Sequence, residues 1–144
     1  MVGEILADQA HANALQRALL AEAGRFMTAY VQPHHIRLWL AGASGNRTLA
    51  AYEANELGET FDDIKTYKST CKGIPTARLA GVLIEPSLKQ VKAAIAVKSV
   101  VAFKSAYGTL TTGCDVCHIT AQHGFVVIQT PPANPYADQH LIGR

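Results

Sequence analysis

Long apolar runs, an excess of charge of one sign and regular polar–apolar alternation are all missing from this sequence. No apolar run in its 144 residues approaches the roughly 18 needed to span a bilayer, so we expect no membrane span. Thirteen basic and eleven acidic residues leave a formal net charge of +2, which provides no basic stripe for binding nucleic acid. The scarcity of alternating patterns argues against β-strands. These absences predict a helical protein that neither binds nucleic acid nor spans a membrane.

What the sequence does contain favours one compact all-α domain. Hydrophobic residues make up 49% of the chain and charged residues 17%, a balance too apolar for intrinsic disorder. Apolar residues recur at helical spacing, and neither an internal repeat nor a second domain is visible. We therefore expect a single domain over 1–144, with a core at about 24–124 and a tail at 125–144.

Short connections between helices of similar length predict an antiparallel up-down four-helix bundle. The first helix is expected to be long, from Ile5 to about Gly42, or to be split into a helix over 5–23 and a second one, with bends allowed at Gly24 and Pro33. The other helices are expected at 47–67, from after Pro75 to about 97 with an interruption allowed at Pro86, and from 100 to about 121. The Pro-rich stretch Pro131-Pro-Ala-Asn-Pro135 cannot be helical and is expected to run extended across one end of the bundle.

Spacing and cap chemistry predict which faces are buried. In the first helix the expected core stripe is Leu20, Met27, Val31, His34, Leu38 and Ala41, and in the second it is Leu49, Tyr52, Leu57, Phe61 and Ile64. Glu53 is expected on the solvated side of the second helix, where pairing with Arg37 is the less favoured alternative. Asn46 and Ser99 are the expected N-caps, and Gly45 suits a left-handed turn.

The last helix carries the chemical motif of the chain, Cys114-Asp-Val-Cys117-His118. Both cysteines lie on a 3–4 spaced apolar seam, so both are expected to point into the core. Cys-x-x-Cys-His is the attachment signature of c-type haem. Thiols at i and i+3 lie on one helical face and can each add to one haem vinyl group, and His118 is then placed to bind the iron.

Other readings of the motif are open. A thioredoxin-like site has its two cysteines at a helix N-terminus after a strand, whereas this motif lies deep inside a helix. A structural zinc site needs a second ligand pair, and the third cysteine, Cys71, stands alone. Chance occurrence in an ordinary helix is the remaining alternative. With the haem reading, Cys71 is left as the free thiol, able to be oxidised or to link two chains.

A helical bundle whose last helix ends in this motif resembles the cytochrome c′/c556-like group. The segments His34-His-Ile-Arg-Leu-Trp-Leu-Ala-Gly42, Leu49-Ala-Ala-Tyr-Glu53 and Asn134-Pro-Tyr-Ala-Asp-Gln139 also resemble a set of poorly characterised bacterial haem-c proteins. The resemblance covers most of 24–139. It implies one covalent haem c at Cys114 and Cys117, His118 as axial ligand and a periplasmic location. The tail is a departure, since the cytochrome c′ group normally ends soon after its haem motif.

Counting along antiparallel helices suggests what faces the other side of the iron. His118 lies 19 residues, roughly 28 Å, from the end of the bundle where the first helix finishes near Ala43. The same count back from Ala43 reaches about residue 24, and Met27 is the good iron ligand in that range. Met27 is thus the candidate second ligand, an arrangement that raises the reduction potential. The alternatives are Met27 as a core filler, bis-histidine ligation through His34 or His35, and a five-coordinate iron.

The leading hypothesis is a monohaem c-type cytochrome that carries one electron between redox partner proteins. We do not expect an enzyme, because no Ser-His-Asp set, paired carboxylates or phosphate loop accompanies the motif. The alternative is a five-coordinate haem protein that binds or senses NO or CO, and a weaker one is a haem-free helical bundle. Residues 1–23 lack the features of a signal peptide, and the stretch from Glu4 to Arg25 could instead pack on another subunit in a homodimer.

Overall fold

The computed structural model describes residues 1–21 and 23–143, and at 14–21 it describes the backbone alone. Every regular element in these ranges is a helix, so the prediction of an all-α protein is confirmed. The elements are α1 (Val2–Ala21), α2 (Ala23–Phe26), η1 (Met27–Val31), α3 (Gln32–Ala43), α4 (Arg47–Tyr67), α5 (Thr76–Leu79), η2 (Ala80–Ile84), α6 (Glu85–Ala96) and α7 (Val100–Thr120). Among the described residues, no helix combines the length and hydropathy needed to cross a membrane.

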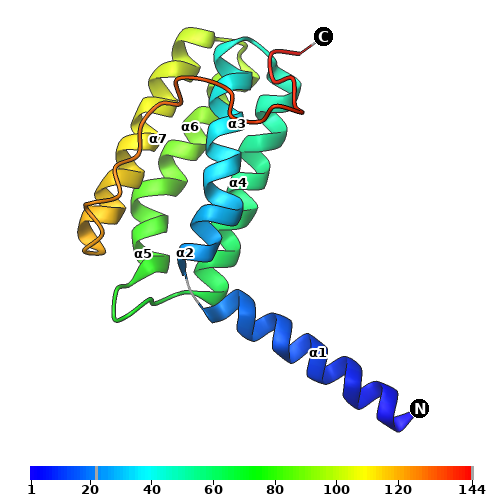
Figure 1. Ribbon diagram of the computed structural model, residues 1–144. Coiled ribbons are helices and arrows are strands. Elements are labelled where there is room, and N and C mark those ends of the chain that lie inside the picture. The colour runs from blue at the N-terminus through cyan, green and yellow to red at the C-terminus, as the bar shows by residue number, and fades with distance from the viewer. Residues whose placement is uncertain (22, 144) are drawn as a thin grey trace.

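The long helices lie side by side, with short turns between neighbours. α3 and α6 each pack against both α4 and α7, and we call α3, α4, α6, α7 and the two η segments the helical core. Figure 1 shows this arrangement, with α1 projecting away from the helical core. All side chains of residues 1–13 are exposed.

Two helical stretches widen into π-helix just before a proline. α2, η1 and α3 follow one another without a break, as do α5, η2 and α6. The N–H of Gln32 donates to the carbonyl of Met27 and that of Glu85 to the carbonyl of Ala80, five residues back instead of four. Proline has no N–H and crowds the preceding turn, so Pro33 and Pro86 favour this widening. The helices therefore continue where a bend or interruption was expected.

The predicted caps and the limits of α4 agree with the structure. α4 spans Arg47–Tyr67 as expected, and the Asn46 side chain accepts a hydrogen bond from the N–H of Leu49. Ser99 caps α7 by accepting from the N–H of Ala102. Gly45 adopts a φ of 80°, the left-handed conformation that the turn between α3 and α4 requires.

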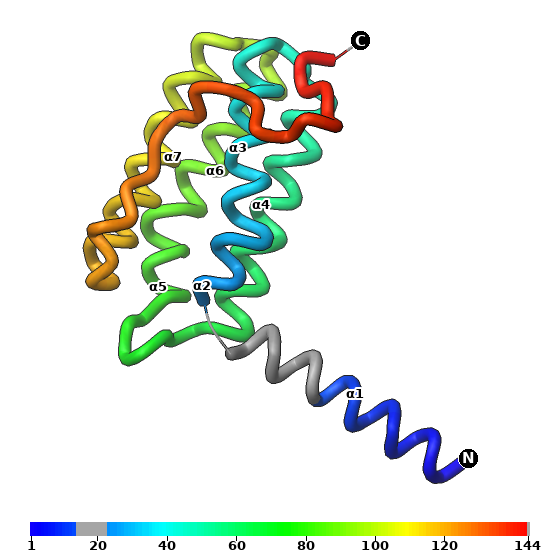
Figure 2. Tube along the Cα trace, in the orientation of Figure 1, coloured from blue at the N-terminus to red at the C-terminus, as the bar shows by residue number. Residues whose placement is uncertain are grey.

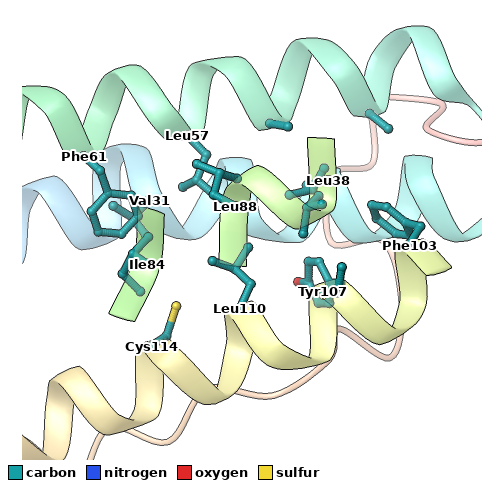
Figure 3. Close-up of a cluster of buried hydrophobic side chains, with 14 of the residues drawn as sticks. Val31, Leu38, Leu57, Phe61, Ile84, Leu88, Phe103, Tyr107, Leu110 and Cys114 are labelled. Atoms are coloured by element: carbon teal, nitrogen blue, oxygen red, sulfur yellow. The ribbon is translucent and has the colours of Figure 1, made fainter. Parts of the chain in front are cut away.

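Apolar side chains from the long helices interlock in the middle of the helical core. Figure 3 shows Val31, Leu38, Leu57, Phe61, Ile84, Leu88, Phe103, Tyr107, Leu110 and Cys114 in this cluster. Phe103 approaches α3 so closely that a Cβ on Gly42 would lie 2.0 Å from its ring. Glycine at this position is thus required by packing.

The buried face of the first core helix differs from the predicted stripe. Phe26 and Val31 are buried, five residues apart, and His35 is only 5% exposed. Met27 lies partly buried at the edge of the core, and His34 is half-buried. The extra residue in η1 shifts the helical register, which a uniform spacing cannot anticipate. Leu20, also in the predicted stripe, lies outside the described side chains.

The predicted face of α4 is also wrong at its N-terminal end. Tyr52, expected in the core, is 57% exposed, and Glu53, expected in solvent, is 1% exposed. The small residues Ala50 and Ala54 are fully buried beside Glu53. The true face therefore contains a carboxylate and two alanines, which a search for large apolar residues overlooks.

The last part of the chain, residues 121–143, runs lengthwise over the helical core; we call it the C-terminal segment. It contains no regular helix or strand in its described residues. The N–H of Ile128 donates to Asp115 of α7, and the carbonyl of Leu141 accepts from Asn46 in the turn between α3 and α4. Figure 2 shows the segment following α7 and then crossing α3. The Pro-rich stretch at 131–135 contains neither helix nor strand.

Candidate functional site

The two cysteines of the motif lie on the core-facing side of α7. Cys114 is buried, Cys117 is half-buried, and both are free thiols. Figure 3 shows the Cys114 sulfur directed toward the side where Ile84 and Val31 lie. The spacing of three residues on a helix keeps Cys117 on the same side.

Burial keeps both thiols protonated at neutral pH. It raises the pKa of Cys114 to about 12, with further contributions from Cys117 and Asp115, and it also raises the pKa of Cys117. Redox-active Cys-x-x-Cys sites have lowered thiol pKa values. The environment in α7 is the opposite of that, which argues against the thioredoxin-like reading.

His118 is half-buried in the last turns of α7, and its Nδ1 is completely buried without a hydrogen-bond partner. Burial lowers the pKa of its imidazole, against the opposing effects of the Asp115 charge and of the Val126 backbone beside the ring. The lowered pKa favours the neutral form of the ring, which is the form that binds metals. Because a buried polar atom without a partner is rare, Nδ1 marks a place where the chain is incomplete by itself.

The C-terminal segment folds back over the motif. The N–H of His123 donates to the carbonyl of His118 at 2.6 Å, and the N–H of Val126 donates to the carbonyl of His123 at 2.9 Å. The Asp115 carboxylate then accepts from the N–H of Ile128 at 2.7 Å. The sequence does not indicate that the C-terminal segment covers the motif, because an extended segment has no periodicity that reveals its neighbours.

Both π segments contribute residues near the motif. Gly113, next to Cys114, touches η2, since a Cβ there would lie 2.6 Å from the carbonyl oxygen of Leu83. Ile84 of η2 and Val31 of η1 are buried in the same cluster as Cys114 (Figure 3). The surroundings of the Cys114 thiol are thus apolar, provided by two helices other than its own.

The pairing of residues between the antiparallel helices α3 and α7 shows how far along the helix axis Met27 lies relative to His118. The Trp39 ring lies 5.0 Å from that of Tyr107, and four residues further along both helices His35 bonds to Thr111. The same register continued to His118 reaches residue 28, next to Met27. Figure 1 shows α7 diverging from α3 toward this end, so the two positions share a height across a widening gap. The structure thus brings Cys114, Cys117 and His118 together and places Met27 at the edge of the core.

Both ring nitrogens of His35 have partners in the core. Tyr107 donates its hydroxyl proton to the carbonyl of His35 at 2.8 Å, which leaves its oxygen to accept from Nδ1 at 3.0 Å. Nε2 then accepts from the hydroxyl of Thr111 at 3.0 Å. Burial lowers the pKa of His35 to about 4, opposed by the charge of Asp115. Iron ligation by His35 would break this network.

His34 points toward α4, where it belongs to a second polar cluster. Its Nδ1 lies 2.6 Å from Glu53, and the Nε of Arg37 donates to the other oxygen of the same carboxylate at 2.9 Å. The guanidinium of Arg37 stacks on Tyr136 of the C-terminal segment, 5.1 Å from the ring centre. The pairing of Arg37 with Glu53 is the less favoured alternative from the sequence, and the contact between His34 and Glu53 is not predicted from it. The cluster ties α3, α4 and the C-terminal segment together.

No protein-family model, curated protein or solved structure matches this chain. Within the described residues, no group of three or more His, Cys, Asp or Glu side chains is arranged to hold a metal ion. Cys71 is half-buried in the loop before α5, where its backbone pairs with that of Ile74.

Proposed function

We propose that this protein is a monohaem c-type cytochrome that carries one electron between redox partner proteins outside the cytoplasmic membrane. The observation that carries the proposal is the arrangement on α7: two free thiols one turn apart face the apolar core, followed directly by the half-buried imidazole of His118. These residues suit a covalently held haem, since neither thiol forms a disulfide and the imidazole of His118 directly follows the second thiol.

Different residues of the chain would bind different parts of the haem. Cys114 and Cys117 would each form a thioether with a vinyl group, and His118 would bind the iron. Val31 and Ile84 would exclude water from the buried side. The bound haem would supply the one-electron chemistry, which no side chain near the motif provides.

We further propose Met27 as the second iron ligand. Its height opposite His118 supports this, and the engagement of His35 with Tyr107 and Thr111 disfavours bis-histidine ligation. A thioether ligand raises the reduction potential, as suits an electron carrier.

A second candidate function, binding of NO or CO at a five-coordinate iron, has its own support. η1 turns Met27 to the edge of the core, and the fully buried side chains at this level, Phe26 and Val31, are apolar and cannot bind iron. A site lined in this way would leave the sixth position open.

We also propose the helix arrangement, the cellular location and the oligomeric state that accompany this function. The long helices would form an antiparallel up-down four-helix bundle with the C-terminal segment as an added tail. Haem attachment would take place in the periplasm, as in the group that the sequence resembles. The exposed residues 2–13 of α1 would provide the contact for a homodimer.

Expression of the full chain with a bacterial haem-attachment system tests the main proposal. We expect a pyridine haemochrome spectrum of covalent haem at one per chain, lost in the double variant Cys114→Ser, Cys117→Ser. The matched control Cys71→Ser should keep its haem, because this thiol lies outside the motif. Absence of covalent haem in the unaltered chain would refute the proposal.

The spectrum of the loaded protein then separates the two candidate functions. A low-spin spectrum that becomes high-spin in Met27→Ala is expected for an electron carrier ligated by Met27. A high-spin spectrum with rapid CO binding in the unaltered protein would instead establish the gas-binding function.

A further inference from the structure

The C-terminal segment meets His118 at the point where the site is incomplete. Nδ1 of His118 is buried without a hydrogen-bond partner, and the Val126 backbone lies beside the ring. The turn that brings Val126 there is fixed by the two backbone hydrogen bonds that link His118, His123 and Val126 in series. The segment thus lies against the imidazole itself as well as over α7.

Asp115 holds this part of the segment on α7. Its carboxylate accepts the N–H of Ile128 at 2.7 Å, two residues beyond Val126. A hydrogen bond between a charged group and a backbone N–H is about twice as strong as one between neutral groups. Asp115 is one of the two variable positions inside the Cys-x-x-Cys motif, so the anchor is built into the motif.

The far end of the segment is fixed independently. Tyr136 stacks under Arg37, Leu141 is 2% exposed, and the Leu141 carbonyl accepts from Asn46. Because both ends are held, the part beside His118 has little freedom to move along α7.

We infer that Asp115 and the C-terminal segment form a positioning device for His118: Asp115 anchors the segment through the N–H of Ile128, and the Val126 backbone supports the imidazole. The inference rests on the proposed function, because it concerns His118 as an iron ligand. An imidazole that binds iron through one nitrogen keeps its proton on the other, and that N–H needs an acceptor. The Val126 backbone is the group that the fold places beside the ring, and Asp115 holds that part of the segment in place through Ile128.

The rate at which added imidazole displaces His118 from the iron tests the inference. Loss of an outer partner of a ligating histidine weakens metal binding by roughly 10–100-fold, so we expect displacement to be about tenfold faster in Asp115→Ala and in Ile128→Pro. Asp115→Asn should show a clearly smaller acceleration than Asp115→Ala, since its amide oxygen can still accept from Ile128 through a weaker, neutral hydrogen bond.

Three controls separate positioning from general destabilisation. Ile128→Ala trims the side chain but keeps the N–H, Asp138→Asn removes a charge elsewhere on the segment, and Val91→Ala destabilises the core of α6 far from the motif. In all three control variants, added imidazole should displace His118 from the iron at the normal rate. Amide hydrogen exchange in the haem-free full chain gives an independent readout, because the Ile128 N–H should lose protection in Asp115→Ala and keep it in Asp115→Asn.

The outcomes are distinct. Unchanged displacement in Ile128→Pro, or equal acceleration in Asp115→Asn and Asp115→Ala, would overturn the positioning role, as would acceleration in Val91→Ala. If the unaltered chain carries haem but the anchor variants behave normally, the inference fails alone. If the unaltered chain carries no covalent haem, the proposed function fails and the inference fails with it.

Discussion

Gly113 of α7 and Leu83 of η2 approach each other so closely that no side chain fits between them. A Cβ on Gly113 would lie 2.6 Å from the carbonyl oxygen of Leu83, a backbone atom that cannot turn aside. This contact fixes the distance between η2 and the helix that carries the cysteines, one residue before Cys114.

Gly113→Ala is expected to destabilise the protein by about 1–3 kcal/mol, the usual cost of an extra methyl group in a packed core. Gly108→Ala on the same helix is the matched control, because a Cβ there meets nothing within 4 Å. Alanine exceeds glycine in helix propensity, so the control should gain roughly 0.5–1 kcal/mol. Urea unfolding of both variants measures the difference, and a Gly113→Ala variant as stable as the control would contradict the close approach.

The buried His35 makes stability depend on pH. Its pKa is about 4 in the folded protein, lowered by burial, against an ordinary value of 6.5. The unfolded chain thus binds a proton that the folded protein does not, and stability that is complete above pH 6.5 falls as the pH drops toward 4. The loss over this range is about 3 kcal/mol.

Urea unfolding of the full chain at pH 7.5 and pH 4.5 measures this dependence. His35→Gln should be less stable at pH 7.5 and should show a smaller decrease on acidification. The exposed His11 provides the control, because His11→Gln should retain the full decrease. An identical pH dependence in His35→Gln would show that His35 is not the group responsible.

Removal of the Glu53 carboxylate is expected to be costly. Glu53→Ala leaves Arg37 and His34 without their shared acceptor, in a place where the Glu53 side chain is 2% exposed. Breaking a buried ion pair on one side costs about 3–5 kcal/mol, and the partial exposure of Arg37 puts the expected loss near about 3 kcal/mol. Glu59→Ala, at an exposed position of α4, should change the unfolding free energy by less than about 1 kcal/mol. A Glu53→Ala variant no less stable than Glu59→Ala would rule out a stabilising cluster.

Local chemistry explains why parts of the fold could be predicted. Asn46 and Ser99 satisfy the first N–H groups of α4 and α7 with their own side chains, so these helix starts are determined within three residues of sequence. The cysteines were predictable for a similar reason, because a spacing of three on any helix places Cys114 and Cys117 on one side.

The other parts of the fold and of the site depend on contacts between distant residues, which the spacing of residues in the sequence does not indicate. Phe26 rather than Met27 is buried with Val31 because η1 adds a residue to the helix. His35 is buried because Tyr107 and Thr111 of another helix bond to its ring. Glu53 is buried because Arg37 and His34 reach it from another helix. The site's cover escaped prediction since the hydrogen bond from Ile128 to Asp115 joins parts of the chain with no shared pattern.

The position of the C-terminal segment also sets an order of events during synthesis. The chain is made from its N-terminus, so α7 with both cysteines exists before the residues that cover it. Ile128, Tyr136 and Leu141, which fasten the cover, are added after the whole of α7. A nascent chain therefore passes through a stage in which the helical core can assemble while the motif is still open to its surroundings.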